Sequence, residues 1–355
     1  MPRVKATSLQ VTPRTQYVLS DYITGLAWSP KTEKLAAIAA SGEVTLYSTS
    51  GEELPLQPAA GLAVNCLSFA ADGRFLATAG QSGQLTVWNI AAHPKIWLQQ
   101  THASAWIDTL AWHPTLPYLA YGVGQKTIIL DVEQRQDVAV LDFQTSSILH
   151  LAWQPTGEHL AVSGHGGVKV WPVSDWQAAP KHIQVPGASL HCAWSQDGRY
   201  LASGNLDRTL TVTQWNSPPP WLMQGFPGKV RQTAWAKGAT RSEAPWLAAA
   251  CAEGITVWQR ESKGKQGWRS QVLQGHRDRV NAIAFHPHSA YLASVGQDGR
   301  VCLWHCGQTL VQTLKHGQVG TTCLAWSASG LWLAAGDKAG ELSLWQVSRQ
   351  VKGFG

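Results

Sequence analysis

Short runs of alternating apolar and polar residues recur along the whole chain. Representative runs are VTLY ending at Tyr47, LTVW ending at Trp88 and VCLW ending at Trp304. Alternation with a period of two is typical of β-strands, and the Gly, Asp, Asn, Ser and Pro residues between the runs are typical of turns. Because no segment keeps the sustained helical period of about 3.6 residues, the pattern predicts an all-β protein built from short strands.

The alternating runs repeat at nearly constant spacing. Each unit contains a strand that ends in a large aromatic residue, and the eight aromatics are Trp28, Phe69, Trp112, Trp153, Trp194, Trp235, Phe285 and Trp326. The intervals between them are 41, 43, 41, 41, 41, 50 and 41 residues. A leucine follows seven residues after the aromatic in every unit except the sixth. Such a unit buries its apolar faces only by stacking against neighbouring copies, so we expect a repeat architecture.

Length and tryptophan content both agree with repeats. The chain has 355 residues, whereas a single hydrophobic core stops growing at about 250–300 residues. It contains 19 Trp against 7 Tyr and 6 Phe, and so many large side chains need a repeated pattern to place them. With 44% hydrophobic and only 14% charged residues, the composition is that of a globular protein without long charged tails.

The seventh unit carries the most specific signature. The sequence LQGH (residues 273–276) precedes the strand VNAIAF, and Ser294, Asp298 and Trp304 follow it. With this signature and eight units in phase, the chain resembles the WD40-repeat β-propellers, whose blades have about 40–45 residues each. The resemblance implies one all-β propeller. We expect eight four-stranded blades, with seven as the alternative if the third or sixth unit is not a true blade.

The two ends of the repeat region indicate how the ring closes. The last unit ends near Trp345, and the segment Thr15–Leu19 stands where outer strands precede the other units. In the family an N-terminal strand completes the last blade, so the resemblance implies the same closure here. Closure would leave only short, protected sheet edges. The predicted organisation is an N-terminal tail (residues 1–14), a WD40-type propeller (15–346) and a C-terminal tail (347–355).

The resemblance also gives a role to four residues of the seventh unit. In the family, residues at the positions of His276, Ser294, Asp298 and Trp304 form a hydrogen-bonded set inside one blade. A buried imidazole, carboxylate and indole N–H each need a partner, so we interpret the set as structural. A catalytic His/Asp/Ser arrangement is the rival, and it is disfavoured because Ser294 lies within a predicted strand. The other units lack the full set, so we expect apolar burial to hold most blades together.

Two basic insertions distinguish the sixth unit. One insertion follows Trp235, and the other spans residues 260–269. Both fall on the propeller face that carries the loops from first to second and from third to fourth strands. The candidate partner-binding residues there are Arg241, Arg260, Lys263, Lys265, Trp268 and Arg269, with Lys237 ranked lowest. An acidic partner would fit this charge, and the net charge of the chain is +6. A solvated loop pair is the competing interpretation.

Trp106 is a separate candidate for binding a partner. It aligns with Arg279 at the entrance to an innermost strand, on the opposite face of the disc from the insertions. An exposed Trp at such a site can anchor a partner protein. Packing of the indole under its own loop is an equally weighted alternative.

Histidine and cysteine residues were assessed as metal ligands. His150 and His191 stand at equivalent positions of neighbouring units, three residues before the aromatic. Zinc needs ligands within about 2.0–2.3 Å of one point, and two ligands do not complete a site, so no metal and no cofactor is expected. The six cysteines form no CxxC pair, and the N-terminus shows no apolar signal segment. Free thiols in the cytoplasm are the expectation.

The sequence contains no Gly-rich phosphate loop, HExxH, GxSxG or paired-carboxylate motif. The leading hypothesis is therefore a non-catalytic scaffold that docks partner proteins on the propeller faces. A metal-handling protein using His150 and His191 is the first alternative, and a basic-face binder of nucleic acid is the second. Neither a small-molecule substrate nor a membrane span is expected, because no apolar run approaches the roughly 18 residues that a span requires.

Overall fold

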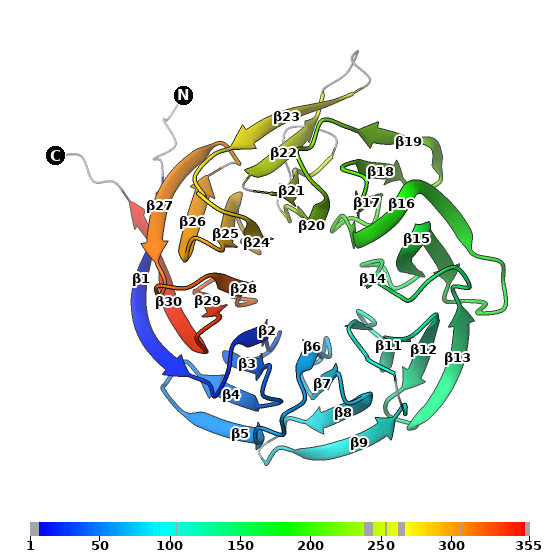
Figure 1. The fold of residues 1–355 in the computed structure, drawn as a ribbon, viewed down its shortest axis with the longest axis horizontal. Helices are drawn as coiled ribbons and strands as arrows, with labels where there is room; N and C mark the ends of the chain where they lie inside the picture. Colours follow the sequence, from blue (N-terminus) through cyan, green and yellow to red (C-terminus); the bar gives the residue numbers. More distant parts are fainter. Residues whose placement is uncertain are drawn as a thin grey trace.

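The structure is a computed structural model, and it describes residues 7–91, 93–103, 105–237, 244–252, 254–261, 267–305 and 307–351. Every regular element in these ranges is a β-strand, which confirms the predicted all-β class. The strands are arranged radially around one axis as a β-propeller (Figure 1). Across the ranges described, no helix exists that would be long and apolar enough to cross a bilayer.

Each unit contributes strands in order from the axis to the rim. The innermost strands are β2 (Ile23–Trp28), β6 (Val64–Phe69), β10 (Leu110–Trp112), β14 (His150–Trp153), β16 (Lys181–Trp194), β20 (Val230–Trp235), β24 (Val280–Phe285) and β28 (Thr321–Trp326). The second strands are β3 (Lys34–Ala39), β7 (Phe75–Gly80), β11 (Tyr118–Val123), β15 (His159–Pro172), β17 (Tyr200–Asn205), β21 (Leu247–Cys251), β25 (Tyr291–Gly296) and β29 (Trp332–Asp337).

The outer half of each unit is built in the same way. The third strands are β4 (Val44–Ser48), β8 (Gln84–Asn89), β12 (Lys126–Asp131), β18 (Leu210–Gln214), β22 (Gly254–Arg260), β26 (Arg300–His305) and β30 (Glu341–Val351). The outermost strands are β5 (Glu53–Gln57), β9 (Lys95–Thr101), β13 (Gln136–Asp142), β19 (Ser217–Met223), β23 (Trp268–Leu273), β27 (Thr309–Lys315) and β1 (Thr7–Val18). In the fourth unit, the long strands β15 and β16 also supply the third and outermost positions.

Hydrogen bonds join these strands into seven sheets, six of four strands and one of six. The six-stranded sheet fuses the fourth and fifth units. β15 bends at Gly166 and Gly167, both with positive φ, and its second half pairs with the first half of β16. The second half of β16 then pairs with β17 as the innermost strand of the fifth unit. The ring therefore contains seven separate sheets. Seven is the alternative number of blades that the sequence predicted.

All eight units are nevertheless present around the axis. Their innermost strands contact one another in a closed order, β2–β6–β10–β14–β16–β20–β24–β28 and back to β2. Each unit is called a blade below, numbered in chain order. The expectation of eight separate four-stranded sheets is corrected only at blades four and five. There, β15 continues from the second into the third position of blade four, and β16 continues from the outermost position of blade four into the innermost position of blade five.

The N-terminal strand closes the ring, as expected. β1 pairs antiparallel with β30 from Thr7 opposite Val351 to Val18 opposite Glu341, so the two ends of the chain share one sheet (Figure 1). β1 begins at Thr7 and β30 continues to Val351. The sheet thus includes residues 7–14 and 347–351, which the sequence assigns to the tails.

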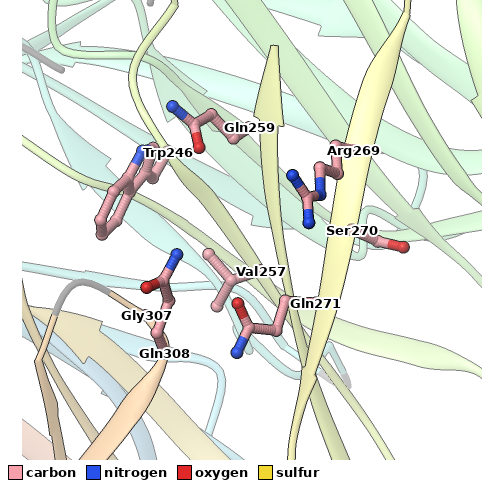
Figure 2. Close-up of a pocket in the computed structure, with 8 residues that line it drawn as sticks. All are labelled: Trp246, Val257, Gln259, Arg269, Ser270, Gln271, Gly307 and Gln308. Carbon is pink, nitrogen blue, oxygen red and sulfur yellow. The ribbon is translucent and has the colours of Figure 1, made fainter. Parts of the chain in front are cut away.

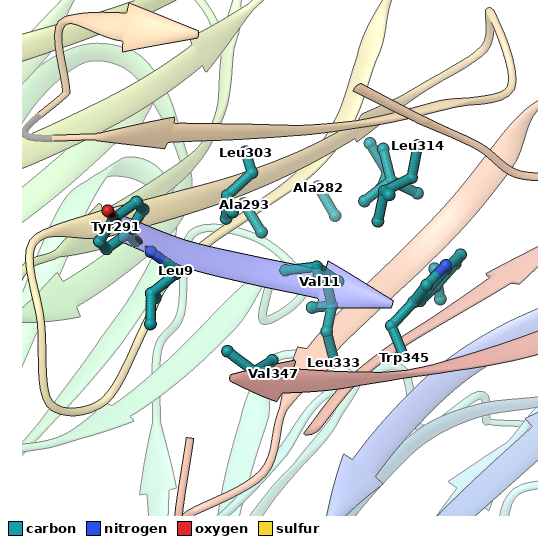
Figure 3. Close-up of a cluster of buried hydrophobic side chains, with 13 residues drawn as sticks. Leu9, Val11, Ala282, Tyr291, Ala293, Leu303, Leu314, Leu333, Trp345 and Val347 are labelled. Carbon is teal, nitrogen blue, oxygen red and sulfur yellow. Dashed lines mark hydrogen bonds between the residues drawn. The ribbon is translucent and has the colours of Figure 1, made fainter. Parts of the chain in front are cut away.

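The same strand joins the last blade to the one before it. Leu9 and Val11 of β1 are buried in a cluster that includes Tyr291 and Trp345 (Figure 3). The Leu9 amide donates to the Tyr291 hydroxyl at 3.1 Å. Gln312 of blade seven accepts from the Val11 amide at 3.2 Å and donates to the Val11 carbonyl at 2.8 Å. β1 is therefore held by backbone pairing on one side and by side-chain hydrogen bonds from a second blade.

A repeated indole hydrogen bond connects neighbouring innermost strands. The Trp at the end of the strand donates its Nε1–H to the carbonyl of the residue before the equivalent aromatic in the preceding blade. The pairs are Trp28 to Ala325, Trp112 to Ser68, Trp153 to Ala111, Trp194 to Ala152, Trp235 to Ala193 and Trp326 to Ala284, at 2.9–3.1 Å. Phe69 and Phe285 occupy the same position without a donor. Six of the eight boundaries between blades therefore carry this bond.

Replacing one of these indoles tests the contribution of the bond. Trp28→Phe keeps an aromatic ring that the chain itself uses at two equivalent positions, but it removes the hydrogen bond to Ala325. We expect the free energy of unfolding to fall by about 1 kcal/mol more than in the matched variant Trp268→Phe. Trp268 is the control because its Nε1 has no partner among the described residues. Urea denaturation measures both variants, and equal losses would show that the indole bond contributes nothing.

Candidate functional site

The propeller presents two faces with different loops. Face A carries the loops from first to second and from third to fourth strands, such as residues 29–33 and 49–52. Face B carries the loops from second to third strands and from each outermost strand to the next blade, such as residues 40–43 and 19–22. The candidate binding residues are placed below by these two faces.

In blade seven the structure joins the four signature residues by hydrogen bonds. His276 lies between the others, with Nδ1 3.0 Å from Asp298 Oδ1 and Nε2 2.8 Å from Ser294 Oγ. Trp304 donates its Nε1–H to Ser294 Oγ at 2.9 Å. Burial alone would raise the pKa of Asp298, but the Arg277 amide and the His276 ring hold it below its ordinary value. All four groups thus have partners inside the blade, as a structural role requires.

Other blades contain buried polar networks at different positions. In blade five, Ser203 donates to Asn205 Oδ1 at 2.7 Å and lies 2.7 Å from the Ser189 hydroxyl, and the Asn205 amide donates to Thr209 and Thr211. In blade eight, the buried His316 ring pairs with Ser343 at 2.9 Å. That apolar burial holds most blades stays a prediction, and these two blades contain buried polar networks in addition. Ser203 stands at the position of Ser294, two residues after the leucine of the second strand, whereas the other residues of these networks do not occupy positions of the blade-seven signature.

The sixth-unit candidates divide into three groups. Arg241, Lys263 and Lys265 lie outside the described residues. Arg260 donates to Tyr200 and to Gln214 of blade five and lies 5.1 Å from the Trp221 ring centroid. This guanidinium therefore joins blade six to blade five rather than standing free on the surface.

Trp268 has a similar position between the blades. Its ring centroid lies 6.0 Å from those of Tyr200, Trp221 and Trp235. The indole is part of an aromatic cluster and not a projecting anchor. Sequence spacing gave no signal for this contact, because it forms laterally between strands of different blades.

Arg269 is exposed and lines a shallow hollow of about 440 Å³ between blades six and seven (Figure 2). The lining residues are Trp246, Val257, Gln259, Arg269, Ser270, Gln271, Gly307 and Gln308. Lys237 is also exposed on face A. Of the sixth-unit candidates that the structure describes, only Arg269 and the lowest-ranked Lys237 are therefore on open surface.

His150 and His191 are brought together in adjacent innermost strands. Their ring centroids are 4.0 Å apart, and His191 Nδ1 lies 3.1 Å from Thr233 Oγ1. Burial lowers the pKa of His150 to about 4, and burial together with the neighbouring His150 ring lowers the pKa of His191 well below its usual range. Among the described residues, no group of three or more His, Cys, Asp or Glu side chains is placed to hold a metal ion.

Face B carries exposed apolar side chains in four consecutive blades. The exposed fractions are 42% for Tyr22, 52% for Leu62, 61% for Trp106 and 40% for Leu149. Each stands in the loop that enters the innermost strand of blades one to four, respectively. Trp106 is the member that sequence analysis singled out, and the other three were missed. We call these four residues the apolar sector.

The Trp106 loop is fixed close to its exposed indole. The next residue, Ile107, is fully buried, and its amide donates to the Gly80 carbonyl of blade two at 3.1 Å. Trp106 therefore projects from an anchored backbone. An anchored aromatic loses little conformational freedom when a partner binds.

Two models of WD40 repeats match segments of this chain. The family model for the WD domain, G-beta repeat, matches residues 135–172, 184–213, 267–305 and 308–346. The model for the WD40 domain of anaphase-promoting complex subunit 4 matches residues 26–113. The chain belongs to the WD40-repeat family.

The relatives that match this WD40 chain are diverse. Mouse telomerase protein component 1 is 25% identical over 295 residues, which are 81% of this chain and 10% of that protein. Human echinoderm microtubule-associated protein-like 2 is 24% identical over 283 residues, or 76% of this chain and 39% of that protein. An uncharacterised WD repeat-containing protein of Synechocystis is 28% identical over 136 residues, covering 38% and 37% of the two chains. The chain thus spans only a minor part of these relatives.

The paired histidines predict a pH dependence of stability. An unfolded His titrates near 6.5, whereas His150 in the fold titrates near 4, so between these pH values the unfolded state binds more protons. Stability contributed by a neutral His150 is therefore complete above about pH 6.5 and falls, by up to about 1.4 kcal/mol per pH unit, as the pH decreases.

The variant His150→Gln removes this titration. Gln is the residue that blade six has at the equivalent position, Gln232. We expect its free energy of unfolding to decline less steeply between pH 7 and pH 5 than that of the parent, measured by urea denaturation across the range. His182→Gln is the control because that ring is already exposed in the fold. Parallel pH profiles of the free energy of unfolding for the parent and His150→Gln would refute the lowered pKa of His150.

Proposed function

We propose that this chain is a non-catalytic interaction scaffold that docks a partner protein on face B, over the apolar sector. The observation that carries the proposal is the alignment of Tyr22, Leu62, Trp106 and Leu149 in four consecutive blades of one face. WD40 propellers typically act as interaction scaffolds, which supports the general class.

The physical argument is that these large apolar side chains are exposed to solvent. Large apolar side chains grouped on one face mark interaction sites more often than isolated ones do. Trp and Tyr are also the residues that most often dominate binding energy at the centre of an interface. The relatives' printed names refer to telomerase and microtubules, but this chain covers 10% and 39% of those proteins, so their partners are not carried over.

The two alternatives have less support. A metal-handling role depends on His150 and His191, and the described residues around them add no third ligand. A basic-face role in the sixth unit now depends on Arg269, because Arg260 and Trp268 are packed between blades. A location in the cytoplasm stays a prediction, and the free state of the five described cysteines is consistent with a reducing compartment.

Substitution in the apolar sector tests the proposal. Trp106→Ala should reduce the yield of captured partners at least about tenfold, because an anchor of this kind contributes roughly 2 kcal/mol or more. Leu331→Ala is the matched control, since Leu331 is 54% exposed but lies on face A. The measurement is quantitative mass spectrometry after affinity purification from the source cells. Equal yields from the parent and Trp106→Ala, or equal losses in both variants, would contradict the proposal.

A further inference from the structure

The other half of face B carries a concentration of positive charge. Exposed cations stand in or beside the face B loops of blades five to eight, among them Arg208, Lys229, Arg231, Arg277, Arg279 and Lys338. We call these six residues the basic sector. The exposed carboxylates in the same described loops are Asp207 and Asp278, so cations predominate.

The apolar sector has the opposite composition. The face B loops of blades one to four contain no Lys or Arg in their sequence, and Lys126 stands at the first position of β12 beside them. Asp21, Glu43 and Asp108 are the acidic residues of these loops. The cations of face B are therefore concentrated in blades five to eight, whereas exposed apolar residues occur in both halves, with Leu206 and Val319 on the basic side.

Among the residues that the structure describes, the basic sector has no acidic partner in an ion pair. On face A, Arg74 pairs with Asp72 and Glu133, and Arg199 pairs with Asp197. The neighbouring carboxylates already accept hydrogen bonds. Asp278 accepts one from the Arg279 amide at 2.6 Å, and Asp207 accepts one from the Thr209 hydroxyl at 2.8 Å.

The two sectors are built from the same structural positions. Lys229 and Arg279 stand six residues before the blade's aromatic, which is also the position of Tyr22 and Trp106. Arg231 is equivalent to Thr322, whose hydroxyl donates to the Ile23 carbonyl of the next blade at 2.6 Å. Because the ring is closed, equivalent loop positions face the same side of the disc. The cations and the apolar residues therefore stand on the same face of the propeller.

We propose that face B binds an acidic polypeptide segment that also carries a large apolar side chain. The carboxylates contact the basic sector, and the apolar side chain lies on the apolar sector. This inference rests on the proposed scaffold function and specifies the chemistry of its partner. A polypeptide fits better than a single-stranded nucleic acid, because the described part of the basic sector offers no exposed aromatic ring for base stacking.

The probe for this proposal is a fluorescein-labelled oligoglutamate peptide that ends in Phe, measured by fluorescence anisotropy with the full chain. The triple variant Lys229→Glu, Arg231→Glu and Arg279→Glu should weaken its binding at least about tenfold, and the corresponding Gln triple should give an intermediate loss. Binding by the parent should weaken as salt is raised, because the contacts are exposed charges.

A matched control places the same charge change on face A. The triple variant Lys31→Glu, Lys237→Glu and Arg269→Glu removes three exposed cations there, including the open sixth-unit candidates. Its affinity should stay within about twofold of the parent. Circular dichroism verifies that all variants are folded, and the Gln triple serves as the second variant if the Glu triple is not.

Three results would overturn the proposal. They are no binding of the oligoglutamate peptide by the parent, equal losses in the two Glu triples, and tighter binding of an oligothymidylate of equal charge than of the peptide. Failure here is distinguishable from failure of the scaffold proposal. If Trp106→Ala still reduces partner capture while the acidic peptide does not bind, the docking surface stands and only the acidic partner is rejected.

Discussion

Closure of the ring is the constraint on which the rest of this structure depends. A radial array of sheets has two unprotected ends unless its first and last repeats share a blade, and exposed sheet edges invite pairing with other chains. Here β1 and β30 supply that shared blade through antiparallel pairing, with one register shift between Pro13 and Thr15. Gln312 and Tyr291 of blade seven then hold β1 from the side. The N-terminal strand therefore connects the two last blades as well as the two ends of the chain.

Closure also determines where the loops lie on the two faces. Six indole bonds fix the innermost strands relative to one another, so each loop that enters an innermost strand emerges at a set place on face B. The fold decides where Tyr22, Trp106, Lys229 and Arg279 stand, and the residue type decides what each offers to a partner. A divided binding surface thus requires no special loop structure, only different side chains at equivalent positions of a rigid ring.

Much of the architecture could be predicted from the sequence, because the repeat is encoded locally. The eight aromatics follow from the spacing between units, and the resemblance to WD40 propellers implied the closing strand and the hydrogen-bonded set of blade seven. Fusion of blades four and five was not predictable in this way, since it depends on how the turn at Gly166 and Gly167 is completed by β16.

The candidate site was harder to predict because lateral contacts between blades leave no signal in the spacing. Arg260 and Trp268 looked exposed in sequence but pack against blade five. The two sectors of face B did have a readable signal. At the position that Trp106 shares with Arg279, blade one has Tyr22 and blade six has Lys229, so this part of the difference was visible in the aligned units.

Hydrogen–deuterium exchange of the intact protein tests ring closure most directly. If β1 completes the last blade, the amides of residues 9–18 that pair with β30 will exchange about as slowly as those of β29, and the two strands will lose protection together in denaturant. Exchange of these β1 amides at the rate of an unstructured chain, with β29 still protected, would show that the ring is not closed by the N-terminal strand.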